Sequence, residues 1–285
     1  MAEWRAAMIF RAVLVFVMCA VSARAASMQI STGAYSSGKA HVSCVIDGVK
    51  ERCFLDTGSA MTLVANSKRF SAYTNVGNFR FESASGIPEQ TQTILIGSIQ
   101  IDGVELRDKK VGRTSFRGAE NTLGIDVVGR QPFSVNFNPQ GVLKLNAERP
   151  DLPLTTLQVS RQGLLSIPME IGAVEAHALW DTGVALTTID QNFISAHPEN
   201  FKAMKNYMNG VDGAGKSILV QVFRAKKLKI ADRTFKDVRV VGVDLTMLRQ
   251  GVNKDIQAVV GFNLIRKANW FFDPKNRLWS CDTRL

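Results

Sequence analysis

The sequence carries two copies of an Asp-Thr-Gly tripeptide, at residues 56–58 and 181–183. Each copy follows an apolar run and precedes an apolar or threonine-rich run, so a strand, a tight loop and a second strand are predicted at both places. Glycine supplies the backbone freedom that such a loop needs. Aspartate carboxyls can act as general acids and bases. A single copy would be better interpreted as an ordinary turn, because Asp and Gly favour turns.

The two tripeptides belong to an internal repeat. An apolar-apolar-Gly segment follows each of them and ends at Gly124 and at Gly261. A third pair of similar segments, at 137–143 and 272–278, closes each unit. The three landmarks recur in the same order at offsets of 125, 137 and 135 residues. This recurrence makes two unrelated turns an improbable explanation of the tripeptides.

Between the landmarks the sequence alternates short β-type runs with turn residues, and helical patterns are scarce. An all-β fold with few short helices is therefore predicted. Short helices are expected directly after Gly124 and Gly261. A longer helix is expected over residues 198–208, where three apolar side chains would share a face.

The boundary between the repeated units is predicted within residues 146–163. This segment contains Pro150 and Pro153 and has no sustained periodicity. The chain is accordingly divided into residues 26–148 and 149–285. Each unit is long enough to form its own hydrophobic core.

Residues 1–25 have the pattern of a secretory signal peptide. Arg5 and Arg11 lie before and at the start of an apolar run, which ends near residue 21, and Ala23-Arg24-Ala25 is a small-residue cleavage site. Cleavage would give a chain that begins near Ala26 and is exported, to the periplasm or outside the cell. An uncleaved anchor with the same export topology is the alternative. The run of about ten residues is shorter than the roughly 20 that span a bilayer, so a polytopic membrane protein is excluded.

Composition narrows the class of protein further. Of 285 residues, 46% are hydrophobic and 21% charged, which excludes intrinsic disorder of the whole chain. The formal net charge is +10, but the basic residues are scattered. The densest cluster, at 226–229, alternates with apolar residues and is interpreted as a solvated strand face rather than a nucleic-acid groove.

Two cysteines flank a predicted hairpin turn. Cys44 and Cys53 lie on either side of Asp47-Gly48, and an exported protein meets an oxidising compartment. A Cys44–Cys53 disulfide is predicted, with a pair of buried thiols as the alternative. Cys281 would then remain a free thiol.

Two Asp-Thr-Gly loops, each followed by an apolar-apolar-Gly segment, resemble the aspartic protease superfamily, which includes pepsin-like and retroviral-type enzymes. The resemblance covers nearly the whole chain after residue 25, and the unit length is nearer to the retroviral type. The chain thus resembles two retropepsin-like units fused in one polypeptide. This implies an all-β, bilobal acid-protease fold with two pseudo-twofold-related β-barrel-like lobes. Asp56 and Asp181 would meet at the floor of a cleft as the catalytic pair.

The resemblance also implies roles for the neighbours of the two aspartates. The threonines would brace the two loops by mutual hydrogen bonds, the loop glycines would present N–H groups to the carboxylates, and the downstream glycines would lie beside the loops, where a larger side chain would obstruct the crossing. The two candidate flaps over the cleft are residues 84–86 and 213–215. The supporting residues are Thr57, Gly58, Ser59, Thr182, Gly183, Gly124 and Gly261.

Two carboxyls held close together cannot both ionise cheaply, so such a pair shares one proton. The ionised partner can take a proton from water while the protonated partner polarises a substrate carbonyl, which hydrolyses an amide without a covalent intermediate. Ser59 follows the first loop and Val184 the second. We therefore expect the Ser59 hydroxyl to donate to Asp56, leaving the charge on Asp56 and the proton on Asp181.

The predicted function is that of an exported, monomeric aspartic endopeptidase that acts on extended peptides or proteins, with no cofactor, metal or nucleic acid. The alternative is a catalytically silent relative of the cell envelope that captures peptides by strand addition. Both aspartates are present, which favours the enzyme. Other catalytic classes find no support, since neither a His-Glu-x-x-His nor a Gly-x-Ser-x-Gly motif occurs.

Overall fold

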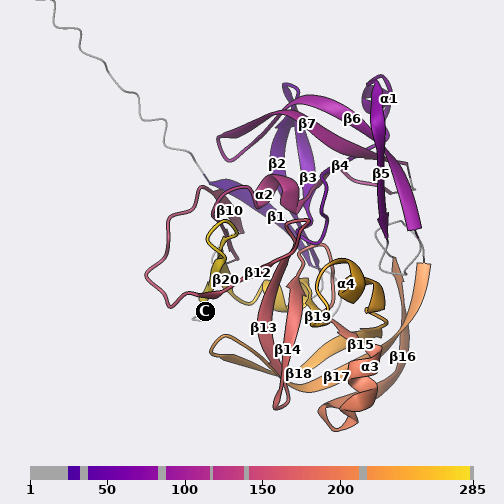
Figure 1. The fold of residues 1–285 in the computed structure, drawn as a ribbon, viewed down its shortest axis with the longest axis vertical. Helices are drawn as coiled ribbons and strands as arrows, with labels where there is room; N and C mark the ends of the chain where they lie inside the picture. The colour runs from indigo at the N-terminus through magenta and orange to yellow at the C-terminus, as the bar shows by residue number, and fades with distance from the viewer. Residues whose placement is uncertain are drawn as a thin grey trace, which may run out of the picture.

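The computed structural model describes residues 25–32, 38–82, 88–115, 118–137, 141–211 and 217–282 (Figure 1). Residues 1–24 of the predicted signal peptide and both candidate flaps, 84–86 and 213–215, lie outside this part. The described residues are mostly β-strand with a few short helices, so the all-β prediction is confirmed. None of these helices has the length and apolar character required to cross a bilayer.

Six antiparallel strands, three from each half of the chain, form one continuous layer. Its central pair joins β9 to β20 through Phe133 opposite Phe272 and Val135 opposite Trp270. The closing landmarks of the repeat therefore lie at or beside the strands of this layer. In spatial order the strands are β1 (Ala26–Thr32), β10 (Val142–Leu145), β9 (Phe133–Asn136), β20 (Asn269–Asp273), β21 (Leu278–Asp282) and β11 (Thr155–Thr156).

Beyond this layer the two halves repeat one strand order. In the first half β1 leads into β2 (Gly38–Ile46), β3 (Val49–Leu55), β8 (Thr122–Leu123), β4 (Leu63–Ala65), β7 (Val104–Thr114), β6 (Pro88–Ile101) and β5 (Asn75–Glu82). In the second half the order is β12 (Gln158–Val159), β13 (Leu165–Ile171), β14 (Val174–Trp180), β19 (Ile256–Val260), β15 (Thr188–Asp190), β18 (Arg233–Val243), β17 (Ser217–Ile230) and β16 (Phe201–Val211). The parallel pairs β3–β8 and β14–β19 occur at the same step of this order.

Tight turns set the register of the hairpins. Asp47-Gly48 joins β2 to β3 with φ values of 44° and 76°, and Asp102-Gly103 joins β6 to β7 with φ values of 50° and 71°. Two successive positive φ angles give the turn whose twist matches that of the flanking strands, and Asp-Gly is a favoured sequence for it. The predicted turn between Cys44 and Cys53 is thus present.

Short helices are present where the sequence predicts them after the two downstream glycines: α2 (Ile125–Val128) follows Gly124 and α5 (Phe262–Ile265) follows Gly261. The described part of the chain also contains the helices α1 (Lys68–Ser71), α3 (Gln191–Ala196) and α4 (Thr246–Gly251). The predicted helix over 198–208 is wrong. Only a 3-10 turn, η2 (Pro198–Asn200), forms there, and strand β16 follows it.

A bulge in β16 explains this error. Between Ala203 and Tyr207 the strand takes four steps, while its partner β17 takes only two, from Phe223 to Gln221. The bulge turns side chains spaced by three and four residues toward buried surfaces without a helix. Phe201 packs in the main core, whereas Met204 and Met208 pack against a second apolar cluster. Long-range pairing with β17 thus overrides the local spacing.

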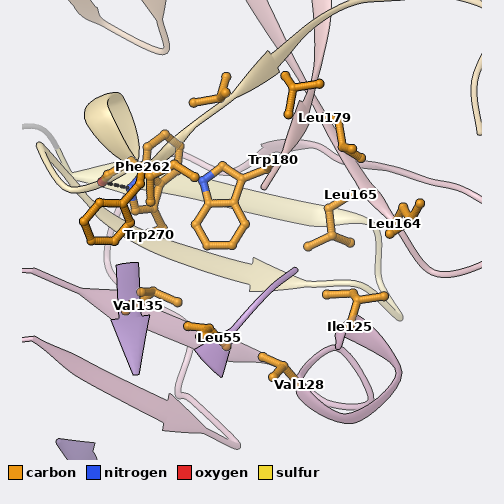
Figure 2. Packing of buried hydrophobic residues seen from close by; sticks show 14 of the residues in the cluster. Leu55, Ile125, Val128, Val135, Leu164, Leu165, Leu179, Trp180, Phe262 and Trp270 are labelled. Carbon is orange, nitrogen blue, oxygen red and sulfur yellow. Dashed lines mark hydrogen bonds between the residues drawn. The ribbon is translucent and has the colours of Figure 1, made fainter. Parts of the chain in front are cut away.

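One hydrophobic core extends across both halves and reaches the two Asp-Thr-Gly loops (Figure 2). Leu55 and Trp180, the residues directly before the two aspartates, are fully buried in it. The Trp180 ring lies 4.6 Å from the Phe272 ring and 5.7 Å from the Trp270 ring, measured between centroids. The shared layer therefore supplies the aromatic packing that anchors the second loop.

Candidate active site

The two aspartates follow the ends of equivalent strands. β3 ends at Leu55 and β14 ends at Trp180. The backbone N–H of Asp56 donates to the carbonyl of Leu123 at 3.0 Å, and that of Asp181 donates to the carbonyl of Val260 at 3.1 Å. Each loop is thus held by a neighbouring strand, β8 in the first half and β19 in the second. That strand pairs in parallel with the strand before the loop and ends just before the downstream glycine.

Thr57 and Thr182 tie the two loops together. The N–H of each threonine donates to the hydroxyl oxygen of the other at 3.1 Å. The Thr57 hydroxyl donates to the carbonyl of Trp180 at 3.1 Å, and the Thr182 hydroxyl donates to the carbonyl of Leu55 at 2.7 Å. Both threonines are completely buried. The structure thus contains the reciprocal bracing that the sequence resemblance implies.

The two carboxyls lie against each other. The N–H of Gly58 is 3.1 Å from Oδ1 of Asp56 and 3.1 Å from Oδ1 of Asp181, so one donor serves both side chains. The carboxyls also hydrogen-bond each other. The Gly183 N–H donates to Oδ1 of Asp181 at 2.7 Å.

Only glycine fits at the third position of either loop. A Cβ on Gly58 would lie 2.1 Å from Oδ2 of Asp181, and a Cβ on Gly183 would lie 2.4 Å from Oδ1 of Asp56. Each loop glycine therefore faces the carboxyl of the opposite half of the chain. This contact allows the two acidic groups to approach each other.

Burial raises the pKa of both carboxyls, and at Asp56 the charge of Asp181 is the next cause. Backbone N–H groups oppose this shift by stabilising the ionised form. Each carboxyl accepts two such bonds, Asp56 from Gly58 and Ser59, and Asp181 from Gly58 and Gly183. The pair thus favours a single shared proton.

The expected role of Ser59 is therefore wrong. Its hydroxyl donates to the carbonyl of Met61 at 2.7 Å, and only its backbone N–H, at 3.1 Å, reaches Oδ1 of Asp56. The serine closes its own turn instead of supplying an additional donor to the carboxylate. The predicted placing of the charge on Asp56 and the proton on Asp181 thus loses the hydroxyl donor on which it rested.

A second pair of polar contacts supports the loops and was not predicted from the sequence. Oδ1 of Asp126 accepts bonds from both the N–H and the hydroxyl of Thr62, each at 2.8 Å. In the second half Oδ1 of Asn263 accepts the same two bonds from Thr187, again at 2.8 Å. Their positions within the matched segments are the one sequence signal that could have identified them, since a polar residue, Asp126 or Asn263, stands two residues after the downstream glycine inside an apolar run.

The downstream glycines occupy equivalent, crowded positions. Gly124 N–H donates to the Thr62 hydroxyl at 3.0 Å, and Gly261 N–H donates to the Thr187 hydroxyl at 3.2 Å. A Cβ on Gly124 would lie 2.7 Å from the backbone carbon of Met61, and one on Gly261 would lie 2.6 Å from that of Leu186. The predicted obstruction of any larger side chain is thus present at both positions.

The sheet surfaces beside the two loops differ in chemistry. Gly112 pairs with both Leu63 and Thr93, and Val241 pairs in the same way with both Thr188 and Val222. Thr93 and Val222 are therefore equivalent positions. The first surface is built around Met61, Thr91, Thr93, Gly112 and Thr114, whereas the second is an apolar cluster of Leu186, Val220, Val222 and Val241 against which Met204 and Met208 pack.

The strands that precede and follow the two candidate flaps in the sequence form equivalent pairs. β5 pairs with β6 as far as Glu82 opposite Pro88, and β16 pairs with β17 as far as Val211 opposite Ser217. In Figure 1 both pairs lie on the same side of the molecule. They occupy the same place in the strand order of the two halves.

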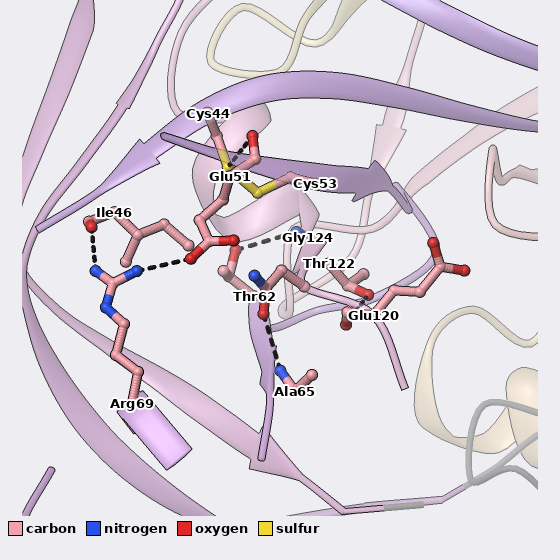
Figure 3. Close-up of a disulfide and its surroundings, with 11 residues drawn as sticks. Cys44, Ile46, Glu51, Cys53, Thr62, Ala65, Arg69, Glu120, Thr122 and Gly124 are labelled. Atoms are coloured by element: carbon pink, nitrogen blue, oxygen red, sulfur yellow. Dashed lines mark hydrogen bonds and ion pairs between the residues drawn. A yellow bond between two sulfur atoms is a disulfide. The ribbon is translucent and has the colours of Figure 1, made fainter. Parts of the chain in front are cut away.

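Cys44 and Cys53 are joined in a disulfide between β2 and β3 (Figure 3). Cys281 is a free thiol, and burial raises its pKa to about 12. A thiol with so high a pKa is almost entirely protonated at neutral pH and is a poor nucleophile. Cysteine chemistry therefore does not compete with the aspartate pair.

Within the described ranges, no three His, Cys, Asp or Glu side chains gather in a way that could hold a metal ion. No protein-family model matches the sequence, and no curated protein matches it significantly.

Proposed function

We propose that the chain is an aspartic endopeptidase of the aspartic protease superfamily, in which Asp56 and Asp181 form the catalytic pair. The observation that carries the proposal is the pair itself: two carboxyls from equivalent loops hydrogen-bond each other and share the N–H of Gly58. Such a pair retains one proton between two acidic groups. It can therefore supply an acid and a base at the same point.

The proposed fold is a bilobal acid-protease fold with one lobe from each half. Two observations support it. The strand order of the two halves is the same, and in each half an additional pairing, β2 with β6 and β13 with β17, joins strands that are distant in that order. Such closing pairs are expected of barrel-like lobes. The loops that carry the aspartates would then be related by a pseudo-twofold axis.

In the proposed mechanism the ionised carboxyl of the pair takes a proton from a water molecule while the protonated carboxyl donates its proton toward the carbonyl oxygen of the scissile amide. The water oxygen forms the new bond to the carbonyl carbon, giving a tetrahedral intermediate. The C–N bond then breaks, and the leaving nitrogen takes the proton that came from water while the hydroxyl proton of the intermediate returns to the carboxyl that donated it. No covalent enzyme intermediate forms.

The proposed substrate is an extended peptide or protein segment. Its backbone would lie between the hairpins β5–β6 and β16–β17, whose strands can offer backbone hydrogen bonds. A monomer suffices, because one chain supplies both carboxyls. The signal-peptide pattern of residues 1–25 supports export, to the periplasm or outside the cell, and the proposed reaction requires no cofactor.

The test is cleavage of a peptide library by the purified chain that begins at Ala26, from acid to neutral pH. Wild type is expected to cut and to be inhibited by a pepstatin-type inhibitor. Asp56→Asn and Asp181→Asn should each abolish cutting, whereas Asp108→Asn, at an exposed position of β7, should not. A wild-type chain that binds library peptides without cutting them would instead support the silent peptide-binding relative.

A further inference from the structure

Asp102 is a buried carboxyl that the proposed mechanism does not use. It is 8% exposed and occupies the positive-φ turn between β6 and β7. Its Oδ2 accepts the backbone N–H of Leu145 at 2.6 Å, but its Oδ1 is buried and has no hydrogen-bond partner. Burial raises the pKa of Asp102. A carboxylate with an unpaired buried oxygen is destabilising, so its retention requires an explanation.

The carboxyl lies at the first residue of strand β1. Ala26 pairs with Leu143 of β10, two residues before the Leu145 that bonds to Asp102. The backbone N–H of Ala26 interacts with the Asp102 carboxyl and lowers its pKa, as does the charge of Lys144. Ala25, directly before it, is exposed and has no strand pairing. Ala26 is also the residue at which the exported chain is predicted to begin.

We infer that Asp102 is the acceptor for the α-ammonium group of Ala26 that removal of the leader after Ala25 creates. A leader-cleaving endopeptidase and one water molecule would break the Ala25–Ala26 peptide bond. The hydroxyl would go to the carbonyl of Ala25, and the nitrogen of Ala26 would gain one hydrogen from the water and a further proton from solvent. The amide at this position has one N–H of fixed direction, whereas the ammonium has three donors that rotate and a positive charge.

The new ammonium would supply the donor that Oδ1 lacks and place a positive charge directly beside the carboxyl. This ion pair would stabilise more than the first residue, because β1 pairs with β10 in the six-stranded layer and with β2 in the first half. A fixed first residue would anchor the strand that joins these two sheets. The processed chain would thus be more stable than its precursor, whether or not the protein is a peptidase.

The test compares the chain that begins at Ala26 with its N-acetylated form, which restores an amide at this nitrogen, in wild type and in Asp102→Asn. Asparagine tolerates the positive φ of this turn. Acetylation should raise the unfolding equilibrium constant of wild type about ten- to hundredfold and leave that of Asp102→Asn unchanged. A chain extended by Ala25 should behave like the acetylated form, because its charge is displaced by one residue.

A second measurement decides the matter if Asp102→Asn does not fold. The α-ammonium of Ala26 should titrate above the usual value of about 7.7–8.0 in the wild-type chain. Asp108→Asn, another positive-φ aspartate but an exposed one, serves as the matched substitution and should retain the raised pKa. An ordinary pKa, an equal effect of acetylation in both backgrounds, or an exported protein whose first residue is not Ala26 would overturn the inference.

Discussion

Replacement of Thr57 by valine tests the contact that holds the two loops together. The Thr57 hydroxyl donates to the carbonyl of Trp180 and accepts from the N–H of Thr182, both at 3.1 Å. Valine puts a methyl group of similar size in the same place, so no cavity forms. The carbonyl and the N–H remain buried and lose these partners. The variant therefore isolates the hydrogen bonds from the packing.

The expected loss follows from counting these groups. A buried donor or acceptor left unsatisfied costs about 1–3 kcal/mol, so two of them cost about 2–6 kcal/mol. Thr182→Val should cost a similar amount, because it leaves the carbonyl of Leu55 and the N–H of Thr57 without these bonds. The two variants affect different backbone groups. Their costs should add, apart from the direct contact of the two hydroxyl oxygens at 3.4 Å.

Urea unfolding followed by tryptophan fluorescence measures these losses as shifts of the midpoint at constant slope. Thr155→Val is the control, since Thr155 is exposed on the edge strand β11 and its replacement should change stability by less than about 0.5 kcal/mol. If Thr57→Val were as mild as this control, or if Thr57→Val and Thr182→Val differed by several-fold, the reasoning from reciprocal hydrogen bonds would be refuted.

Three further predictions concern the site and its support. Ser59→Ala should leave the pH–activity profile unmoved, because the hydroxyl bonds to Met61 rather than to the carboxyl; a shifted profile would contradict this assignment. Replacing Cys44 and Cys53 together by alanine should lower stability by about 2–4 kcal/mol in urea unfolding, and an unchanged midpoint would show that the bridge constrains little. Val222→Thr should lower stability by about 1–3 kcal/mol in urea unfolding, because it places a hydroxyl inside a buried apolar cluster, whereas Leu219→Thr, on the exposed face of the same strand, should not.

The sequence was informative where a residue type has few structural alternatives. Asp-Thr-Gly repeated at 56–58 and 181–183 indicated two equivalent loops, and Asp-Gly between Cys44 and Cys53 indicated a tight hairpin. Both indications depend on local conformation, because the glycines and the positive φ angles are properties of the loops themselves. The all-β class followed from the same short-range patterns.

The features that sequence reasoning missed depend on long-range pairing. Residues 198–208 have helical apolar spacing, yet the pairing of 201–211 with β17 and a bulge make them a strand. The contacts of Asp126 and Asn263 arise only when segments far apart in the chain meet. The Ser59 hydroxyl could reach either the carboxyl or a carbonyl of its own turn, and only the folded loop decides between them.

The two halves of the chain are unequal in a way that bears on the proposed mechanism. In a strictly symmetric pair the proton would occupy either carboxyl equally. Here each carboxyl accepts two backbone N–H bonds, but the donors differ: Gly58 donates to both carboxyls, Ser59 only to Asp56, and Gly183 only to Asp181. The shared proton of the proposed pair therefore has two non-equivalent positions. A pair of identical subunits could distinguish its two acids only after a substrate had broken the symmetry, whereas a duplicated chain distinguishes them by its sequence.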